Sequence, residues 1–198
     1  MYSDITGIIL AGGKSSRMGV NKSFLRLGNQ TIIERITDLM NSLFKEVIII
    51  TNTPEEYEFL NRSLHKDIYI GYGPLGGIHS GLIYSKTEKN FVISCDVPRM
   101  TKEMIEYIVN FQTHKPIVFC QAGGYHQPLV GIYKKKIIVE IEKFLSDNTK
   151  TADKSFHHFL KDVNAELIDP KDLPFYKDEI FFNVNNPDDY SLILSEYY

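Results

Sequence analysis

A cluster of small and basic residues follows the first strongly apolar segment of the chain. Leu10–Gly19 reads LAGGKSSRMG, and Lys22 comes three residues later. Small residues let the backbone approach a ligand closely and point successive N–H groups into one concavity that suits phosphate oxygens. Lys14, Arg17 and Lys22 add three cationic side chains. The pattern predicts a phosphate-binding loop, and a glycine-rich turn with solvated basic residues is the alternative interpretation.

A single carboxylate follows a buried strand in the middle of the chain. Phe91–Cys95 is a continuous apolar run, and Asp96 comes directly after it, two residues before Pro98. Mg²⁺ takes one or two carboxylates together with substrate phosphates, so one aspartate is sufficient for a metal site of this kind. The alternative is an aspartate that only caps a turn. Cys95 alternates with Asp96 along the strand, so we assign the cysteine to packing and reject it as a nucleophile.

Two asparagines share one face of a short segment near the end of the chain. Phe181–Pro187 reads FFNVNNP, and its alternation predicts a short extended run over Phe181–Asn185. Asn183 and Asn185 would then lie side by side, where their amides can hydrogen-bond the heteroatoms of a ligand. Asn186 is better explained as the cap of a terminal helix that begins at Pro187.

One glycine-rich segment imitates a dinucleotide-binding loop. Gly71–Gly76 reads GYGPLG, which satisfies G-x-G-x-x-G, and Asp96 lies twenty residues beyond it. That spacing is typical of NAD-binding proteins. The strand predicted before it, Asp67–Ile70, is weak and third in order, and Pro74 removes an N–H group from the turn. An NAD-dependent oxidoreductase is therefore disfavoured.

The elements that must position these residues alternate between strands and helices. Strands are predicted at Thr6–Leu10, Glu46–Thr51, Asp67–Ile70, Phe91–Cys95, Pro116–Cys120, Pro128–Tyr133 and Ala165–Ile168. Helices are predicted after the capping box Thr31/Glu34, after Thr53-Pro54, after Gly77, from Thr101 to about Gln112, and over Lys136–Leu145 and Asp153–Lys161. The order predicts an α/β fold, a three-layer α/β/α sandwich with a Rossmann-like, mostly parallel sheet. We expect a single domain over residues 1–198, with a nucleotide-binding half to about residue 120 and an acceptor-binding half over about 121–198.

Composition limits the classes of partner. The 198 residues are 43% hydrophobic and 24% charged, with a formal net charge of −3. A negative chain has no general electrostatic basis for binding duplex nucleic acid. No segment approaches the roughly 18 apolar residues that a membrane span needs. Two cysteines in predicted strands and the lack of a secretory signal lead us to expect a reduced, cytoplasmic protein.

The first motif carries a close family resemblance. LAGGKSSRMGxNK, Leu10–Lys22, resembles the signature of the molybdenum cofactor guanylyltransferases, within the wider nucleotidyltransferase family whose loop reads LAGGxxxRM. Asp96 matches the family's S-x-D-x-P pattern, Gly73–Ile78 matches G-P-L-x-G-I, and the two asparagines match N-x-N-T-P. Gln127–Gly131 is similar to the family's P-L-x-G strand.

The resemblance implies a role for each matched residue. Arg17, Lys22 and Asp96 are the implied catalytic residues, with Asp96 as the Mg²⁺ ligand. The acceptor-binding residues are Lys154, Asn183 and Asn185. We assign fourteen residues to nucleotide binding: Leu10, Ala11, Gly12, Gly13, Lys14, Arg17, Lys22, Asn52, Asp67, Gly73, Pro74, Leu75, Gly76 and Asp96. Asp67 is the nearest counterpart of an aspartate that the family usually carries before the glycine-rich motif.

The resemblance also implies a reaction and its partners. The expected activity is transfer of GMP from GTP to the phosphate of molybdopterin (the molybdenum cofactor), with Mg²⁺ bound and pyrophosphate released. Transient contacts with other cofactor-biosynthesis proteins or molybdoenzymes would fit this role. The alternatives are a relative that uses CTP with the same acceptor, a sugar-phosphate or polyol-phosphate nucleotidyltransferase, and a nucleotide-binding regulator without activity.

Overall fold

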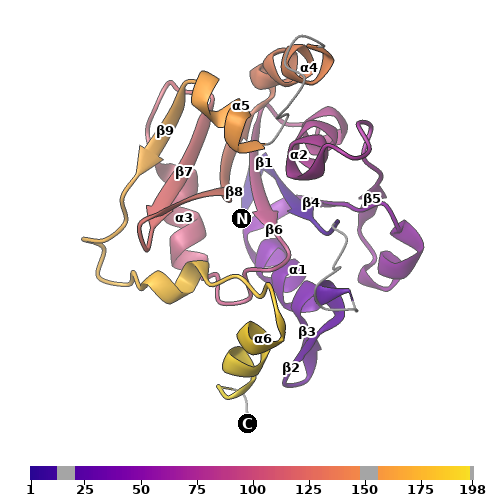
Figure 1. Cartoon of the computed structure of the whole chain (residues 1–198), viewed down its shortest axis with the longest axis vertical. Coiled ribbons are helices and arrows are strands. Elements are labelled where there is room, and N and C mark those ends of the chain that lie inside the picture. The colour runs from indigo at the N-terminus through magenta and orange to yellow at the C-terminus, as the bar shows by residue number, and fades with distance from the viewer. Residues whose placement is uncertain (13–20, 148–155, 197–198) are drawn as a thin grey trace.

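Seven strands form the main sheet of the computed structural model, which describes residues 1–12, 21–147 and 156–196 (Figure 1). In spatial order they are β5 (Ser63–His65), β4 (Phe44–Ile50), β1 (Tyr2–Leu10), β6 (Lys89–Ser94), β8 (Tyr125–Lys134), β7 (Ile117–Ala122) and β9 (Ala165–Ile168). A separate ribbon pairs β2 (Arg26–Leu27) with β3 (Gln30–Thr31). The predicted α/β architecture with a mostly parallel sheet is confirmed.

Strand direction determines where ligands can bind. β1 pairs in parallel with both β4 and β6, and β4 pairs in parallel with β5. β8 is antiparallel to both of its neighbours, β6 and β7, and β7 is parallel to β9. The carboxyl ends of β1, β4 and β6 therefore meet at one edge, where open α/β sheets bind their ligands.

Six α-helices occur in the described chain: α1 (Ile32–Leu43), α2 (Gly73–Tyr84), α3 (Lys102–Asn110), α4 (Ile138–Ser146), α5 (Phe156–Asp162) and α6 (Pro187–Leu194). The short 3-10 helices are η1 (Lys22–Phe24), η2 (Pro54–Leu60), η3 (Lys135–Ile137) and η4 (Asp178–Phe181).

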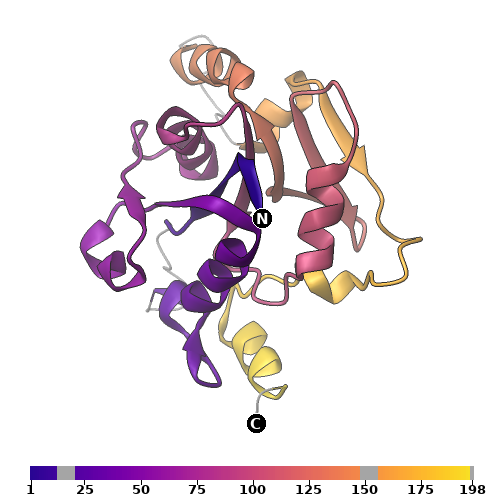
Figure 2. The same cartoon turned by 180° about the vertical axis from the view of Figure 1, so that it is seen from behind.

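Apolar layers on both faces of the sheet hold the helices in place. Ile9 faces one layer, which it shares with α1 and α3, whereas its neighbour Ile8 faces the layer formed with α2, α4 and α5. Adjacent strand residues point to opposite faces, so a strand covered on both sides must be apolar throughout. Figure 2, the view from behind, shows α1 and α3 on the face of the sheet that is turned toward the viewer. This arrangement confirms the three layers and explains the continuous apolar runs.

Polar caps fix where the helices begin. Thr31 and Glu34 form a capping box at α1, in which the Thr31 hydroxyl oxygen accepts from the Glu34 N–H at 3.3 Å. Thr101 caps α3, and Asn186 caps α6 with Pro187 in its first turn. Each side chain satisfies backbone N–H groups that have no partner within the helix. These predicted helix starts are confirmed.

The predicted strand at Asp67–Ile70 is wrong. The strand that pairs with the outer side of β4 is β5, which lies earlier in the chain at Ser63–His65. Side chains satisfy the backbone N–H groups that a strand would have used. The Asp67 N–H donates to the Asn52 side chain at 3.2 Å, and the Ile68 N–H donates to Ser80 at 2.8 Å. The chain then turns at Gly71, whose φ is +90°.

The extended run predicted at Phe181–Asn185 is not a strand either. η4 ends at Phe181, and the following residues join no sheet. One backbone hydrogen bond, from the Val184 N–H to the Asp96 carbonyl at 3.0 Å, attaches the segment to the loop after β6. Two smaller differences concern helices. α2 begins at Gly73 rather than after Gly77, and the segment after Thr53 is a 3-10 helix.

A glycine in β8 permits close contact with β7. The register between these strands shifts between Phe119 and Cys120, opposite Pro128, which has no N–H group to donate. A Cβ atom on Gly131 would lie 2.2 Å from the Val118 carbonyl oxygen, which belongs to the sheet backbone.

We expect Gly131→Ala to destabilise the protein by about 1–3 kcal/mol, because the sheet backbone must move to accept the methyl group. In a chain of this size each kcal/mol lowers the melting temperature by about 2–4 °C. Tyr125→Ala is the control, since this side chain at the end of the same strand is 76% exposed. Thermal denaturation of both variants measures the difference, and equal melting temperatures would show that the close contact at Gly131 does not limit stability.

Candidate functional site

The ends of β1, β4 and β6 lie side by side at the site edge of the sheet. The Ala11 N–H donates to the Ile50 carbonyl at 2.9 Å, and the Cys95 N–H donates to the Leu10 carbonyl at 3.1 Å. These bonds extend the parallel pairing by one residue beyond each strand. They place the start of the predicted phosphate loop beside Asp96.

Lys22 joins three parts of the chain that are distant in sequence. Its Nζ donates to the Asn185 Oδ1 at 3.0 Å and lies 3.9 Å from the Asp96 Oδ2. The side chains of Lys22 and Asp96 are 21% and 20% exposed, so a ligand can reach both. The structure thus brings together one residue predicted to bind the nucleotide, one predicted to bind the metal and one predicted to bind the acceptor. We call Lys22, Asp96 and Asn185 the reaction cluster.

Two contacts hold the Asp96 carboxylate and its backbone. The Ser94 hydroxyl donates to Asp96 Oδ1 at 2.6 Å, and the Asp96 carbonyl accepts from Val184. No group of three or more His, Cys, Asp or Glu side chains that could hold a metal ion occurs among the described residues. A single, partly exposed carboxylate fits Mg²⁺ that takes its remaining ligands from phosphates and water.

A buried polar network surrounds the residues on either side of Lys22. The Tyr57 hydroxyl oxygen lies 3.0 Å from the Ala11 carbonyl oxygen, 3.0 Å from the Asn21 side-chain nitrogen and 3.2 Å from Ser23 Oγ. Ser23 Oγ in turn lies 3.1 Å from Cys95 Sγ. Burial raises the pKa of the Tyr57 phenol, so its hydroxyl stays protonated and can donate at neutral pH.

Cys95 is unsuited to nucleophilic chemistry. Its side chain is buried, and burial raises the pKa of the thiol to about 12, with the negative charge of Asp96 as a further cause. Only a thiolate is an effective nucleophile. The assignment of Cys95 to packing is confirmed.

Asn52 and Asp67 form a pair beyond the end of β4. The Asn52 Nδ2 donates to the Asp67 Oδ2 at 2.9 Å. A Cβ atom on Gly77 would lie 3.2 Å from the Leu10 side chain and 3.6 Å from Asp67 Oδ1, so this carboxylate faces the start of α2 beside Leu10. Burial raises the pKa of Asp67, and the hydrogen bond from Asn52 opposes that shift. Three residues that we predicted to bind the nucleotide therefore lie together.

The glycine-rich motif at the start of α2 divides into two parts. Gly73 and Pro74 are exposed, and Gly73 has a φ of +56°. Leu75 and Gly76 are buried, and a Cβ atom on Gly76 would lie 2.5 Å from the Tyr69 carbonyl oxygen. Leu75 and Gly76 therefore pack in the core, whereas Gly73 and Pro74 are accessible to a ligand. Residues 66–72 contain no strand, so the strand that a dinucleotide fingerprint requires is missing from this place.

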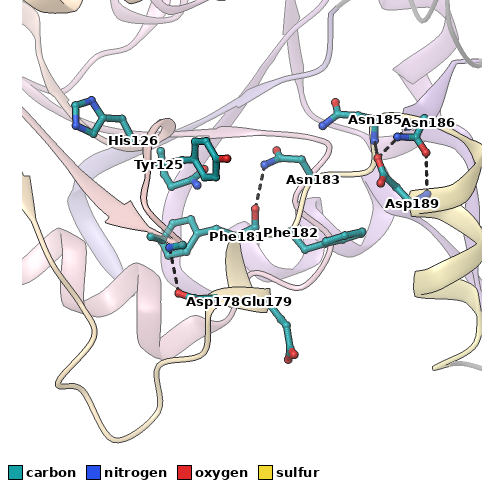
Figure 3. A pocket seen from close by; sticks show the side chains of 13 residues that line it. Tyr125, His126, Asp178, Glu179, Phe181, Phe182, Asn183, Asn185, Asn186 and Asp189 are labelled. Atoms are coloured by element: carbon teal, nitrogen blue, oxygen red, sulfur yellow. Dashed lines mark hydrogen bonds between the residues drawn. The ribbon is translucent and has the colours of Figure 1, made fainter.

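An open groove lies beside the reaction cluster, and Figure 3 shows the side chains around it. Its volume is about 710 Å³. We call it the asparagine groove, and it is lined by Ala122, Gly123, Tyr125, His126, Gln127, Asp178, Glu179, Phe181, Phe182, Asn183, Asn185, Asn186 and Asp189. Asn185 belongs to both the groove and the reaction cluster, so a molecule in the groove can contact a side chain that is hydrogen-bonded to Lys22.

The two asparagines have different surroundings in the groove. The Asn183 Nδ2 donates to the Phe181 carbonyl at 3.0 Å, whereas the Asn185 side chain contacts Lys22. Val184 between them is buried, whereas Asn183 is half-buried and Asn185 is exposed. Asn186 is the cap of α6, as predicted, and the Tyr190 hydroxyl donates to the Arg26 carbonyl, attaching this helix to the β2–β3 ribbon (Figure 1).

Several site residues were not identified from the sequence. Tyr57, Ser23 and Ser94 support the cluster, and Tyr125 and His126 line the groove. For Ser94 the available signal was its place in the S-x-D-x-P pattern. For Tyr125 and His126 it was the preceding glycine pair, because both glycines have positive φ and form the β7–β8 turn. Gly12 is exposed at the start of the predicted loop, whereas Gly13, Lys14, Arg17 and Lys154 lie outside the described residues.

No helix in the described part of the chain is long and apolar enough to cross a membrane.

Comparison with known sequences gives one family. Residues 7–163 match the family described as the MobA-like NTP transferase domain. A protein of Carboxydothermus hydrogenoformans named "Probable molybdenum cofactor guanylyltransferase" is 35% identical over 194 residues, which cover 96% of this chain and 95% of that protein. A protein of Clostridium perfringens strain SM101 with the same name is 40% identical over 185 residues, which cover 92% of each chain.

Solved structures agree with the sequence comparison. The protein Aq1419 of Aquifex aeolicus VF5 superposes with a TM-score of 0.74 at 32% identity, over 91% of this chain and 93% of that one. Molybdopterin-guanine dinucleotide biosynthesis protein A of Archaeoglobus fulgidus has the same fold, with a TM-score of 0.81 at 20% identity, over 96% of this chain and 97% of that one. The family match covers residues 7–163, and the strand ends and the reaction cluster lie within the fold that it predicts. The chain therefore belongs to the MobA-like NTP transferase family and is a nucleotidyltransferase.

Proposed function

We propose that the protein transfers GMP from GTP to the phosphate of molybdopterin and releases pyrophosphate. The observation that carries this proposal is the reaction cluster, in which Lys22 contacts both Asp96 beside the nucleotide loop and Asn185 in the asparagine groove. The names of the similar proteins of C. hydrogenoformans and C. perfringens support the choice of nucleotide and acceptor. We assign the reaction to the cytoplasm as part of the same proposal.

The proposed reaction forms one P–O bond and breaks another. An oxygen of the acceptor phosphate attacks the α-phosphorus of GTP, and the bond from that phosphorus to the bridging oxygen of the β-phosphate breaks. The attacking group is already an anion, so no general base is required. Catalysis then depends on positioning and on neutralising charge. Lys22 lies where it can pair with phosphate oxygens, at the boundary between the loop and the groove.

Asp96 would hold Mg²⁺ in this scheme. The bound ion would neutralise charge on the phosphate oxygens. The hydrogen bond from Ser94 to Asp96 Oδ1 orients the carboxylate, with Oδ2 on the side of Lys22. Arg17, by the family resemblance, would add a second cation to the triphosphate.

The pair formed by Asn52 and Asp67 supports GTP over CTP. Asp67 lies beside Leu10 and Gly77, at the start of the helix that follows the glycine-rich motif. A carboxylate accepts hydrogen bonds only, and the pairing edge of guanine presents two adjacent N–H donors, whereas that of cytosine presents one amino group. CTP-dependent transfer to the same acceptor remains the second candidate, and the base edge is the feature that separates the two.

We expect GTP with Mg²⁺ to stabilise the protein against heat more than CTP or ATP does, because only guanine satisfies Asp67 with two donors. At about 100 times its dissociation constant a ligand adds about 2.7 kcal/mol of stability. Thermal denaturation with each nucleotide measures the difference, and Asp67→Asn should reduce the preference for GTP. Equal or greater stabilisation by CTP would favour the cytidylyl alternative.

We expect Asp96→Asn to keep its melting temperature but to lose GMP transfer by at least about 100-fold, since a neutral amide is a poor ligand for Mg²⁺ and several kcal/mol of charge stabilisation depend on the ion. Transfer of label from α-labelled GTP to molybdopterin measures the loss. Asp188→Asn, at an exposed aspartate of α6, is the matched control. Near-normal transfer by Asp96→Asn would remove the proposed metal site.

Asn183→Ala should impair the acceptor step and leave GTP affinity unchanged. Losing one hydrogen bond of about 0.5–1.5 kcal/mol corresponds to about a two- to thirteen-fold fall in transfer efficiency. Asn185→Ala should change both steps, because Asn185 contacts Lys22 at 3.0 Å. Asn110→Ala is the control, since its amide also donates to a backbone carbonyl but lies on α3. If Asn183→Ala lost melting temperature and kept acceptor kinetics, its amide would serve the backbone only.

A further inference from the structure

Tyr57 occupies a position that connects the end of β1 to both neighbours of Lys22. It comes from η2 and is fully buried. Its hydroxyl oxygen lies within 3.2 Å of three polar groups, on Ala11, Asn21 and Ser23. Asn21 and Ser23 directly flank Lys22 in the chain, and Asn21 also caps η1 by accepting from the Ser23 N–H at 3.1 Å.

The donors and acceptors of this network can all be satisfied at once. The Ala11 carbonyl only accepts, so it takes the single phenolic proton of Tyr57. The oxygen of Tyr57 can then accept from the Asn21 amide and from the Ser23 hydroxyl, and Ser23 can accept from the Cys95 thiol. Loss of the phenol would remove the donor to the Ala11 carbonyl and one contact each from Asn21 and Ser23, which also contact Glu56 and Cys95.

Packing explains the ring of Tyr57 but not its hydroxyl. The ring contacts that of Phe24 with centroids 5.0 Å apart, and a phenylalanine would keep this contact. The ring contacts this segment at Phe24, the last residue of η1, whereas the hydroxyl contacts the side chains on either side of Lys22. Lysine is a point charge on a flexible stem of four carbons, so its ability to hold a ligand depends on where its backbone is fixed.

We propose that Tyr57 is a positioning residue for nucleotide binding, whose hydroxyl fixes the backbone of Lys22 against the end of β1. The inference rests on the proposed role of Lys22 in binding the triphosphate. It adds a residue outside the reaction cluster that acts through Lys22 and touches neither substrate.

Tyr57→Phe tests the proposal, with Tyr133→Phe as the matched control. Tyr133 is also fully buried, and its hydroxyl donates to the Pro128 carbonyl within β8, away from Lys22. Each variant loses the phenolic hydroxyl of a fully buried tyrosine. We expect both to lose melting temperature, but only Tyr57→Phe to raise the dissociation constant for GTP with Mg²⁺, by about three- to ten-fold in titration calorimetry.

A double-mutant cycle separates positioning from general stability. If Tyr57 acts through Lys22, Tyr57→Phe should change GTP affinity less than about two-fold when Lys22→Ala is already present. The proposal is overturned if Tyr57→Phe leaves GTP affinity unchanged in the wild-type background, or if its effect is equally large without Lys22. Should Tyr57→Phe fail to fold, Ser23→Ala replaces it and must give the same pattern. If Lys22→Ala itself left GTP affinity intact, the proposed function of Lys22 would fail instead.

Discussion

The parallel alignment of β1 with β4 and β6 is the constraint on which the site depends. Because these strands end at one edge, the loop after β1 and the loop after β6 must start side by side, and Lys22 and Asp96 come within 3.9 Å. Like charges gathered at such an edge would repel one another, whereas Lys22 and Asp96 form a pair of opposite charges. A triphosphate with a bound cation can replace this pairing without leaving either side chain uncompensated.

The segment before α6 is attached to this edge by contacts with the reaction cluster itself. Residues 182–185 belong to no strand, and the Val184 N–H and the Asn185 side chain connect them to Asp96 and Lys22. The segment predicted to bind the acceptor therefore meets the residues predicted to bind the nucleotide and the metal at the reaction cluster. An enzyme that joins two phosphorylated substrates gains from this arrangement, because proximity and orientation supply much of the rate.

The sequence predicted those features that local physics determines. Ile8 and Ile9 must both be apolar because their strand is covered on both faces. Thr31, Thr101 and Asn186 each satisfy a helix N–H group within three residues. The strands, the helix caps and the α/β/α layers could therefore be predicted from local sequence. The strand prediction for Asp67–Ile70 was wrong because N–H groups in this segment donate to the side chains of Asn52 and Ser80, twelve to fifteen residues away. Tyr57 was missed for the same reason, since its partners lie 34 to 46 residues away in the chain. The contacts of the groove likewise depend on tertiary structure that no local pattern encodes.

We propose a reaction between GTP and molybdopterin at the Lys22–Asp96–Asn185 cluster. Its most direct test is pyrophosphate release by the purified protein with Mg²⁺ and each of the four ribonucleoside triphosphates, with and without molybdopterin. The account predicts release with GTP that requires molybdopterin and is at least about ten-fold slower with any other triphosphate, a difference of about 1.4 kcal/mol. Release that proceeds equally well with CTP, or that does not depend on molybdopterin, would contradict it.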